Sequence, residues 1–152
     1  MCGRFANQLE SREAWEEYFG SAMHEQQSSA QVQEVLDACA IGYNITPTQM
    51  IPVITKSGDN GGRPLLAARW GMIGPWVKDA SEISSKFATF NARSETVAEK
   101  ATFKGAVAAG RRCVIPAIGY YEWQATDDGK QPFFMHRADD APFFFGGLYE
   151  PA

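Results

Sequence analysis

The stretch CVIPAIGYYEW, residues 113–123, carries the β-branched and aromatic residues on which the expected fold class depends. It predicts a strand from Cys113 to Ile118 that continues through Tyr120–Trp123. The sequence DDGK at 127–130 predicts a hairpin turn directly after this strand. The later half of the chain is therefore expected to be mostly antiparallel sheet. Two more strands, Pro132–Arg137 and Pro142–Tyr149, would complete a meander.

The segments before this stretch predict short helices and further strands. Apolar residues at i, i+3, i+4 and i+7 indicate an amphipathic helix over Ala30–Cys39, which Gly42 would end. With 14 glycines and 8 prolines, the composition favours a turn-rich domain. We therefore expect a β-rich α+β fold, mostly antiparallel sheet or a partly open barrel, with a few short peripheral helices. The other expected elements are helices over Ser11–Phe19, Glu95–Lys100 and Phe103–Ala109, strands over Met50–Lys56 and Pro64–Met72, a turn at Tyr43–Pro47, a loop at Ser57–Gly62 and a surface segment reaching Ala88.

Length, charge and cysteine usage limit the possible functions. The 152 residues suffice for one domain with its own core. A formal net charge of −4 argues against coating duplex DNA by bulk electrostatics, although it allows a local basic groove. No apolar run approaches the roughly 18 residues of a membrane span, and no signal segment is present, so we expect a cytoplasmic or nuclear protein. Cys2, Cys39 and Cys113 match no zinc pattern, which indicates reduced thiols and no metal or cofactor.

Cys2 has a chemical option that an internal cysteine lacks. Removal of Met1 would leave a thiol and a free α-amine on the same residue, with ordinary pKa values of about 8.5 and about 8. Such an aminothiol captures an aldehyde as a Schiff base, and its sulfur then closes a thiazolidine ring. Gly3 permits close approach to the backbone, Arg4 adds a positive charge, and Phe5 offers an apolar anchor. The alternative is a disordered start in which Cys2 has no role.

Two polar groups elsewhere have candidate chemical roles. Glu122 shares a strand face with Tyr120, and a carboxylate among aromatic residues suits proton transfer, unless that face is simply solvated. Asn91 and Arg93 alternate along one short stretch and would project together. An asparagine orients a reacting group by hydrogen bonds, and an arginine grips phosphate. The alternative for this stretch is a helix-entry turn.

Several aromatic residues flank glycines or prolines instead of lying in periodic runs. Trp70 and Trp76 are of this kind, and so is Tyr43. Bases stack on such rings while guanidinium groups hold phosphates, so these residues, with Arg4, Arg69 and Arg93, would suit a groove for single-stranded nucleic acid. Plain core packing is the alternative.

Taken together, these segments resemble the SRAP family, the SOS-response-associated peptidases or abasic-site-shielding proteins. The matching motifs follow the family order over nearly the whole chain. They are Cys2-Gly3-Arg4-Phe5, Tyr43–Pro47, Trp70-Gly71 with Pro75-Trp76, Asn91–Thr96, Cys113–Pro116, Gly119–Trp123 and Lys130–Phe134.

The resemblance implies one SRAP-like domain over residues 1–152 that binds single-stranded DNA as a monomer and links covalently to abasic sites. It implies Cys2 as nucleophile, Asn91 as the residue that positions the terminus, and Glu122 as the proton-transfer group. A cytoplasmic, nucleoid-associated or nuclear location would follow. The implied DNA contacts are Arg4 and Arg93 on phosphates, with Trp70, Trp76, Asn44 and Pro47.

Two departures from the family pattern affect these expectations. The chain ends at Ala152, before the family's later histidine-arginine-methionine-proline segment, so a carboxy-terminal segment is expected to be missing. His136 lies where the family has no catalytic histidine, and the last strand is expected to have an exposed edge. If Met1 is retained, the nitrogen of Cys2 is an amide and no thiazolidine forms.

Other functions remain open from the sequence. Some amidohydrolases with an amino-terminal nucleophile also begin Met-Cys-Gly, but Arg4 is unusual for them. A cysteine peptidase using Cys2 and Glu122 is a second alternative. A third is a single-stranded DNA-binding protein that forms no covalent bond.

Overall fold

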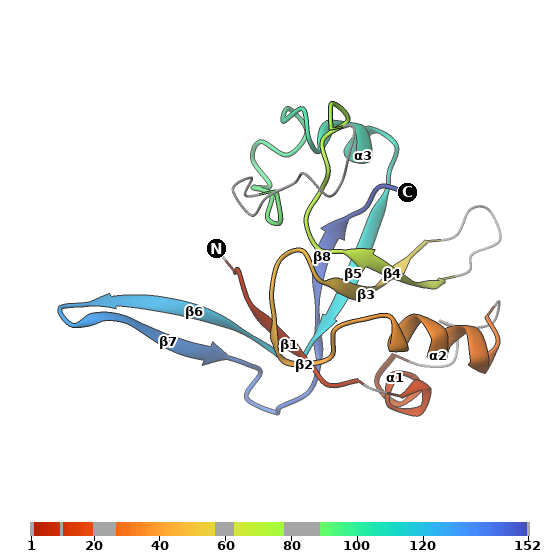
Figure 1. Ribbon diagram of the computed structural model, residues 1–152, viewed down its shortest axis with the longest axis horizontal. Helices are drawn as coiled ribbons and strands as arrows, with labels where there is room; N and C mark the ends of the chain where they lie inside the picture. Colours follow the sequence, from red (N-terminus) through yellow and green to blue (C-terminus); the bar gives the residue numbers. More distant parts are fainter. Residues whose placement is uncertain (1, 10, 20–26, 57–62, 78–88, 152) are drawn as a thin grey trace.

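The computed structural model describes residues 2–9, 11–19, 27–56, 63–77 and 89–151. Over these residues the chain forms two antiparallel four-stranded sheets and three short helices (Figure 1). This arrangement confirms the expected β-rich α+β fold of mostly antiparallel strands. Among the described helices, none has both the length and the apolar character needed to cross a membrane.

The first sheet contains the amino-terminal strand and a projecting hairpin. Its order is β2 (Gly42–Ile45), β1 (Phe5–Asn7), β6 (Gly119–Thr126) and β7 (Gly129–Met135). Thr126 pairs with Gly129 across the two-residue turn that the sequence predicts at this place. The β6–β7 hairpin extends from the rest of the molecule as a long arm (Figure 1).

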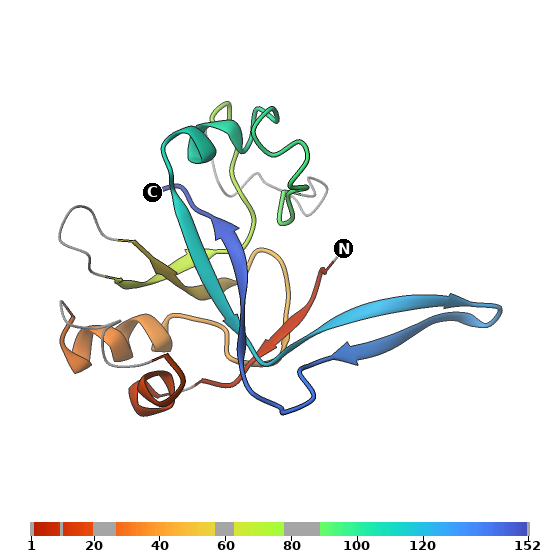
Figure 2. The same ribbon diagram turned by 180° about the vertical axis from the view of Figure 1, so that it is seen from behind.

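The second sheet has the order β4 (Leu65–Arg69), β3 (Met50–Thr55), β5 (Arg112–Ala117) and β8 (Phe143–Leu148). Figure 2 shows from behind that β5 and β8 run side by side. The sequence-based meander is therefore wrong in its last step, because β8 pairs with β5 and not with β7. In the described part of the chain, β8 lies at an edge of its sheet, as expected.

The predicted continuous strand from Cys113 to Trp123 is also wrong, because the chain changes sheets at Ile118. The amide of Ile118 donates to the carbonyl of Ala6, and β6 then runs beside β1. The residue after Ile118 is Gly119, where an added Cβ would lie 2.2 Å from the Phe134 ring and 2.9 Å from the Met135 carbonyl. Only glycine therefore lets β6 start this close to β7.

The first two helices lie close to their predicted positions, and α1 (Arg12–Phe19) ends at the predicted Phe19. Ser11 accepts from the Ala14 amide and caps this helix. A capping box formed by Ser28 and Gln31 starts α2 (Ser29–Asp37), which ends before the predicted Cys39. Gly42 does not end this helix but opens β2 with a φ of 130°.

Some other predictions require correction or lie outside the described residues. The predicted turn at Tyr43–Pro47 is partly strand, since β2 continues to Ile45. Residues Glu95–Lys100 form successive turns and no helix, whereas α3 (Lys104–Ala108) lies within the predicted second helical piece. The loop at 57–62 and most of the segment reaching Ala88 lie outside the described residues.

Two apolar clusters stabilise the sheets. The first surrounds the fully buried Trp15, whose indole nitrogen donates to the Leu9 carbonyl at 2.8 Å. The second joins the two sheets around Phe5 and Cys113, and Cys2, Trp70 and Tyr120 pack against it. The amino-terminal segment is therefore anchored in the core through Phe5.

Candidate functional site

The backbone at Arg4 holds the start of the chain against β6. The Arg4 carbonyl accepts from the Tyr121 amide at 2.9 Å and from the Cys2 thiol at 3.2 Å. Because Phe5 pairs with Tyr120 in the sheet, Cys2 lies just before the start of β1 in a half-buried position. Residue 2 is thus seated in the fold.

The closest contact of this site joins segments far apart in the sequence. The side-chain nitrogen of Asn91 donates to the Cys2 carbonyl oxygen at 2.5 Å, across 89 positions of sequence. Asn91 belongs to an irregular segment that leads into the turns at 94–100. An amide donor on the Cys2 carbonyl fixes the orientation of the residue that bears both the thiol and the backbone nitrogen.

Glu122 acts on the Cys2 thiol through its charge. Burial raises the pKa of the Cys2 thiol above its ordinary value, and the charge of Glu122 raises it further. Backbone hydrogen bonds from Arg4 and Tyr121 lower it, but the net direction is upward. The thiol is therefore protonated at neutral pH and needs a proton acceptor before it can react as a thiolate.

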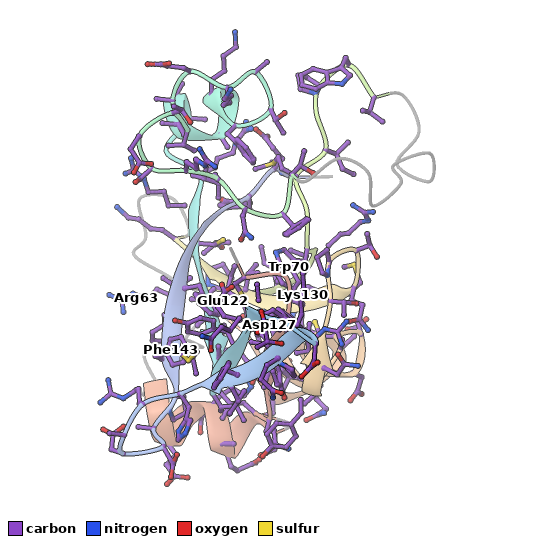
Figure 3. All side chains as sticks on the ribbon, turned by 90° about the vertical axis from the view of Figure 1, so that its left-hand side faces the viewer. Arg63, Trp70, Glu122, Asp127, Lys130 and Phe143 are labelled. Atoms are coloured by element: carbon purple, nitrogen blue, oxygen red, sulfur yellow. The ribbon has the colours of Figure 1, made fainter. Side chains whose placement is uncertain are left out.

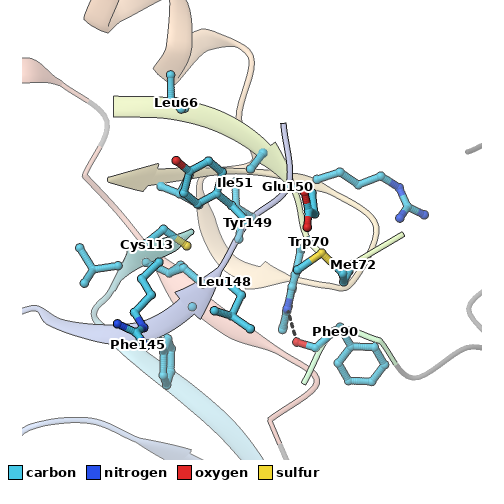
Figure 4. Close-up of a pocket in the computed structure, with 18 of the residues that line it drawn as sticks. Ile51, Leu66, Trp70, Met72, Phe90, Cys113, Phe145, Leu148, Tyr149 and Glu150 are labelled. Carbon is cyan, nitrogen blue, oxygen red and sulfur yellow. Dashed lines mark hydrogen bonds between the residues drawn. The ribbon is translucent and has the colours of Figure 1, made fainter. Parts of the chain in front are cut away.

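Trp70 packs against residues that are close in sequence to Cys2 and Asn91. Its ring meets Phe5 edge to face at a centroid distance of 5.1 Å and Phe90 at 6.0 Å. Its indole nitrogen donates to the Phe90 carbonyl at 3.0 Å, as the dashed line in Figure 4 shows. The ring predicted to contact DNA is thus half-buried and packed on both sides.

A large cavity opens beside these residues. Its volume is about 1250 Å³, and Cys2, Trp70 and Asn91 are among the residues that line it. The labelled wall in Figure 4 is mainly apolar, with side chains from β3, β5 and β8 such as Ile51, Cys113 and Phe145. The candidate nucleophile therefore lies at the wall of this cavity.

The other predicted DNA contacts are exposed or half-buried. The Arg4 guanidinium lies 5.8 Å from the centroid of the Trp123 ring. Because side chains alternate along a strand, Trp123 and Tyr120 project from different faces of β6. Arg93 is exposed two residues after Asn91, and Trp76 is 60% exposed. Asn44 is exposed and Pro47 half-buried on β2 and the segment after it. Of these residues, Arg4 contacts Cys2 through its backbone, since its carbonyl accepts from the Cys2 thiol at 3.2 Å.

Sequence reasoning missed two further parts of the site, Phe90 and the backbone of Tyr121. Phe90 accepts the indole hydrogen bond directly before Asn91, and Tyr121 supports the Arg4 carbonyl that holds the thiol. The only available signal was their position beside Asn91 and Glu122. His136 stacks on Phe134 and pairs with Asp140 at 2.7 Å. Within the described residues, no group of three or more acidic, histidine or cysteine side chains is placed to bind a metal ion.

The sequence profile of the family described as "SOS response associated peptidase (SRAP)" matches residues 1–152. The chain belongs to the SRAP family. The abasic site processing protein YoaM of Bacillus subtilis is 41% identical over 109 residues, which are 71% of this chain and 45% of YoaM. The chicken abasic site processing protein HMCES is 37% identical over 100 residues, which are 62% of this chain and 30% of HMCES. The SRAP chain thus spans less than half the length of these relatives.

Solved structures show the same SRAP architecture. A protein from Bordetella bronchiseptica matches with a TM-score of 0.71 at 30% identity, over 97% of this chain and 63% of its own. A protein from Bacteroides thetaiotaomicron gives the same TM-score at 24% identity and supports the fold alone. The fold is therefore shared beyond the range of close sequence similarity.

Proposed function

We propose that this SRAP protein processes abasic sites in single-stranded DNA by forming a covalent bond through Cys2 after Met1 has been removed. The observation that carries the proposal is the 2.5 Å hydrogen bond from Asn91 to the Cys2 carbonyl. It seats residue 2 at the wall of a cavity of about 1250 Å³. The names of YoaM and HMCES, both abasic site processing proteins, support the same substrate.

The proposed reaction needs no cofactor. The α-amine attacks the carbonyl carbon of the ring-opened sugar, a C–N bond forms, and the carbonyl oxygen leaves as water to give a Schiff base. The sulfur then adds to the same carbon, and the electron pair of the C=N bond and the thiol proton both end on nitrogen. The net change is condensation of an aldehyde with an aminothiol to a thiazolidine and one water.

Asn91 and Glu122 divide the supporting roles in this proposal. Asn91 fixes the Cys2 carbonyl and so directs the amine and the thiol toward the same point. Since burial raises the pKa of the thiol, its proton must be taken up when sulfur attacks. The charge of Glu122 raises the pKa of this thiol, and Glu122 is the proposed acceptor that passes the proton to the imine nitrogen.

Single-stranded DNA is proposed to lie along the accessible residues near the cavity. Arg4 and Arg93 would bind phosphates, and the exposed ring of Trp76 would contact a base or the backbone. Asn44 and Pro47 are proposed as further contacts. Local arginines of this kind bind an unpaired strand although the net charge of the chain is −4.

The test is to mix the protein with an oligonucleotide that carries one abasic site and to measure the intact mass after denaturation. The mass without DNA first shows whether Met1 has been removed. We expect an adduct equal to protein plus DNA minus one water. An unmodified mass from protein that begins at Cys2 would disprove the proposal.

Matched variants separate the alternatives. Cys2→Ala should abolish the adduct, whereas Cys39→Ala should leave it unchanged because Cys39 lies after α2 and outside the cavity lining. Cys2→Ser should give only a Schiff base that survives denaturation after borohydride reduction. A Cys2→Ala protein with full DNA affinity, and wild type with no adduct, would favour non-covalent binding. Cleavage of added peptides would favour the peptidase activity that the family description names.

A further inference from the structure

We propose that Trp70 is a positioning residue for the reaction of Cys2, a role that rests on the proposed function. Trp70 touches both segments that meet at the site. It packs against Phe5, three residues after Cys2, and against Phe90, which directly precedes Asn91. The Trp70 ring therefore contacts both the segment that carries Cys2 and the segment that carries Asn91.

The indole hydrogen bond sets the position of Asn91. The Trp70 Nε1 donates to the Phe90 carbonyl at 3.0 Å, and this carbonyl belongs to the peptide group that joins Phe90 to Asn91. Fixing this peptide group fixes the start of the Asn91 side chain, which then reaches the Cys2 carbonyl at 2.5 Å. Without the N–H donor, the Phe90–Asn91 peptide is free to rotate and the amide loses its alignment.

Two backbone hydrogen bonds fix the position of Trp70 and so of its ring. Its amide donates to the Gln49 carbonyl at 2.9 Å, and its carbonyl accepts from the Thr48 amide at 2.8 Å. Both bonds lie just after β4, whose register with β3 continues to the pair Met50–Arg69. The second sheet thus positions the indole, and the indole positions the segment that carries Asn91.

Trp15 supplies a matched control. Its indole nitrogen also donates to a backbone carbonyl, that of Leu9, at 2.8 Å. Trp15 is fully buried in the other apolar cluster and does not line the cavity. Trp15→Phe therefore removes the same kind of hydrogen bond at a place where only stability is affected.

The test measures rate and affinity separately. Trp70→Phe keeps an aromatic ring and removes the donor. We expect the rate of adduct formation at saturating abasic DNA to fall roughly tenfold, with the Kd for DNA containing a non-reactive tetrahydrofuran site changed by less than about twofold. Trp15→Phe should lower the thermal midpoint and leave the rate unchanged. In an Asn91→Ala background, Trp70→Phe should have no further effect on the rate, since both changes act through one contact.

The outcomes distinguish this inference from the proposed function. An unchanged rate for Trp70→Phe, or a weaker Kd with an unchanged rate, would overturn the positioning role, and the second result would make Trp70 a DNA contact. If wild-type protein forms no adduct, the proposed function fails, and the NMR signal of the Asn91 side-chain amide still tests the geometry. That signal should shift in Trp70→Phe and stay in place in Trp15→Phe. If Trp70→Phe does not fold, benzothienylalanine at position 70 removes the donor with the ring shape retained.

Discussion

The side-chain amide of Asn91 reaches the carbonyl oxygen of Cys2 at 2.5 Å, and these two residues are 89 positions apart in the sequence. The contact joins the irregular segment after residue 88 to the start of β1. It leaves the thiol and the backbone nitrogen of Cys2 to react, since the bond uses only the carbonyl. Asn91 therefore orients Cys2 without using either of the two groups that would react.

Asn91→Ala should therefore slow adduct formation without preventing it. The variant loses one partly buried hydrogen bond, which contributes about 1 kcal/mol, so we expect a rate roughly fivefold to tenfold lower. Asn91→Asp keeps the shape but replaces the donor with an acceptor, and it should be at least as slow. The measurement is the adduct yield over time on a denaturing gel. Wild-type rates in both variants would show that the contact has no part in the reaction.

Glu122→Gln should make the Cys2 thiol more acidic. Burial raises the pKa of this thiol and the negative charge of Glu122 raises it further, so removal of the charge lowers the pKa. Alkylation of Cys2 followed against pH by peptide mass spectrometry should therefore have a lower midpoint in the variant. Adduct formation should nevertheless be slower, because the proposed proton acceptor is lost. A midpoint that rises in Glu122→Gln would contradict the electrostatic assignment.

Arg93→Ala should weaken DNA binding most at low salt. An exposed arginine on a phosphate contributes by counterion release, so its loss should reduce the slope of log affinity against log salt by about one. Arg63→Ala is the matched control, because Arg63 is also exposed and lies away from Trp70 and Glu122 in Figure 3. Equal slopes for the two variants would mean that Arg93 contributes only to the general charge of the protein.

Local sequence signals predicted most elements but not their partners. The apolar spacing of Val32 and Leu36 gave α2, and both residues are buried there. The capping box at Ser28 and Gln31 is visible in the sequence and would have placed the start of this helix correctly. Glu95–Lys100 has only one large apolar residue, Val97, and forms turns with bonds such as Glu99 to Thr96. Without an apolar face to bury, good helix formers did not make a helix.

The arrangement of the site depended on tertiary contacts that no local pattern contains. Cys2, Asn91 and Glu122 could be selected by their chemistry, but not their arrangement. The pairing of Phe5 with Tyr120 brings the start of the chain to the strand of Glu122, and a separate hydrogen bond joins Asn91 to Cys2. The change of sheet at Ile118, which orients β6, depends on the close approach at Gly119. The position of Trp70 beside Gly71 left both a DNA contact and core packing open, and only the tertiary structure shows that its ring packs against Phe5 and Phe90.

High pH should destabilise the protein through its internal thiols. Burial raises the pKa of Cys39 and of Cys113 to about 11. An unfolded thiol ionises near 8.5, so between about pH 9 and 11 the folded state binds more protons and stability falls as pH rises. In Cys113→Ala the fall in thermal midpoint over this range should be shallower than in wild type. An identical pH slope would show that the Cys113 thiol ionises equally well in the folded and unfolded states.

Gly119→Ala should destabilise the fold where the chain passes from β5 in one sheet to β6 in the other. The new methyl group would lie 2.2 Å from the Phe134 ring and 2.9 Å from the Met135 carbonyl, and the second of these is backbone that the hairpin register holds. Overpacking of this kind costs about 1–3 kcal/mol, measurable by urea unfolding. Gly146→Ala on β8 is the control, since no atom lies within 4 Å of its added Cβ. Because Gly119 opens the strand that carries Tyr121 and Glu122, its alanine variant should also slow adduct formation. Equal stability of the two variants would mean that β6 can leave β7 without loss, and the sheet change at Ile118 would then need another cause.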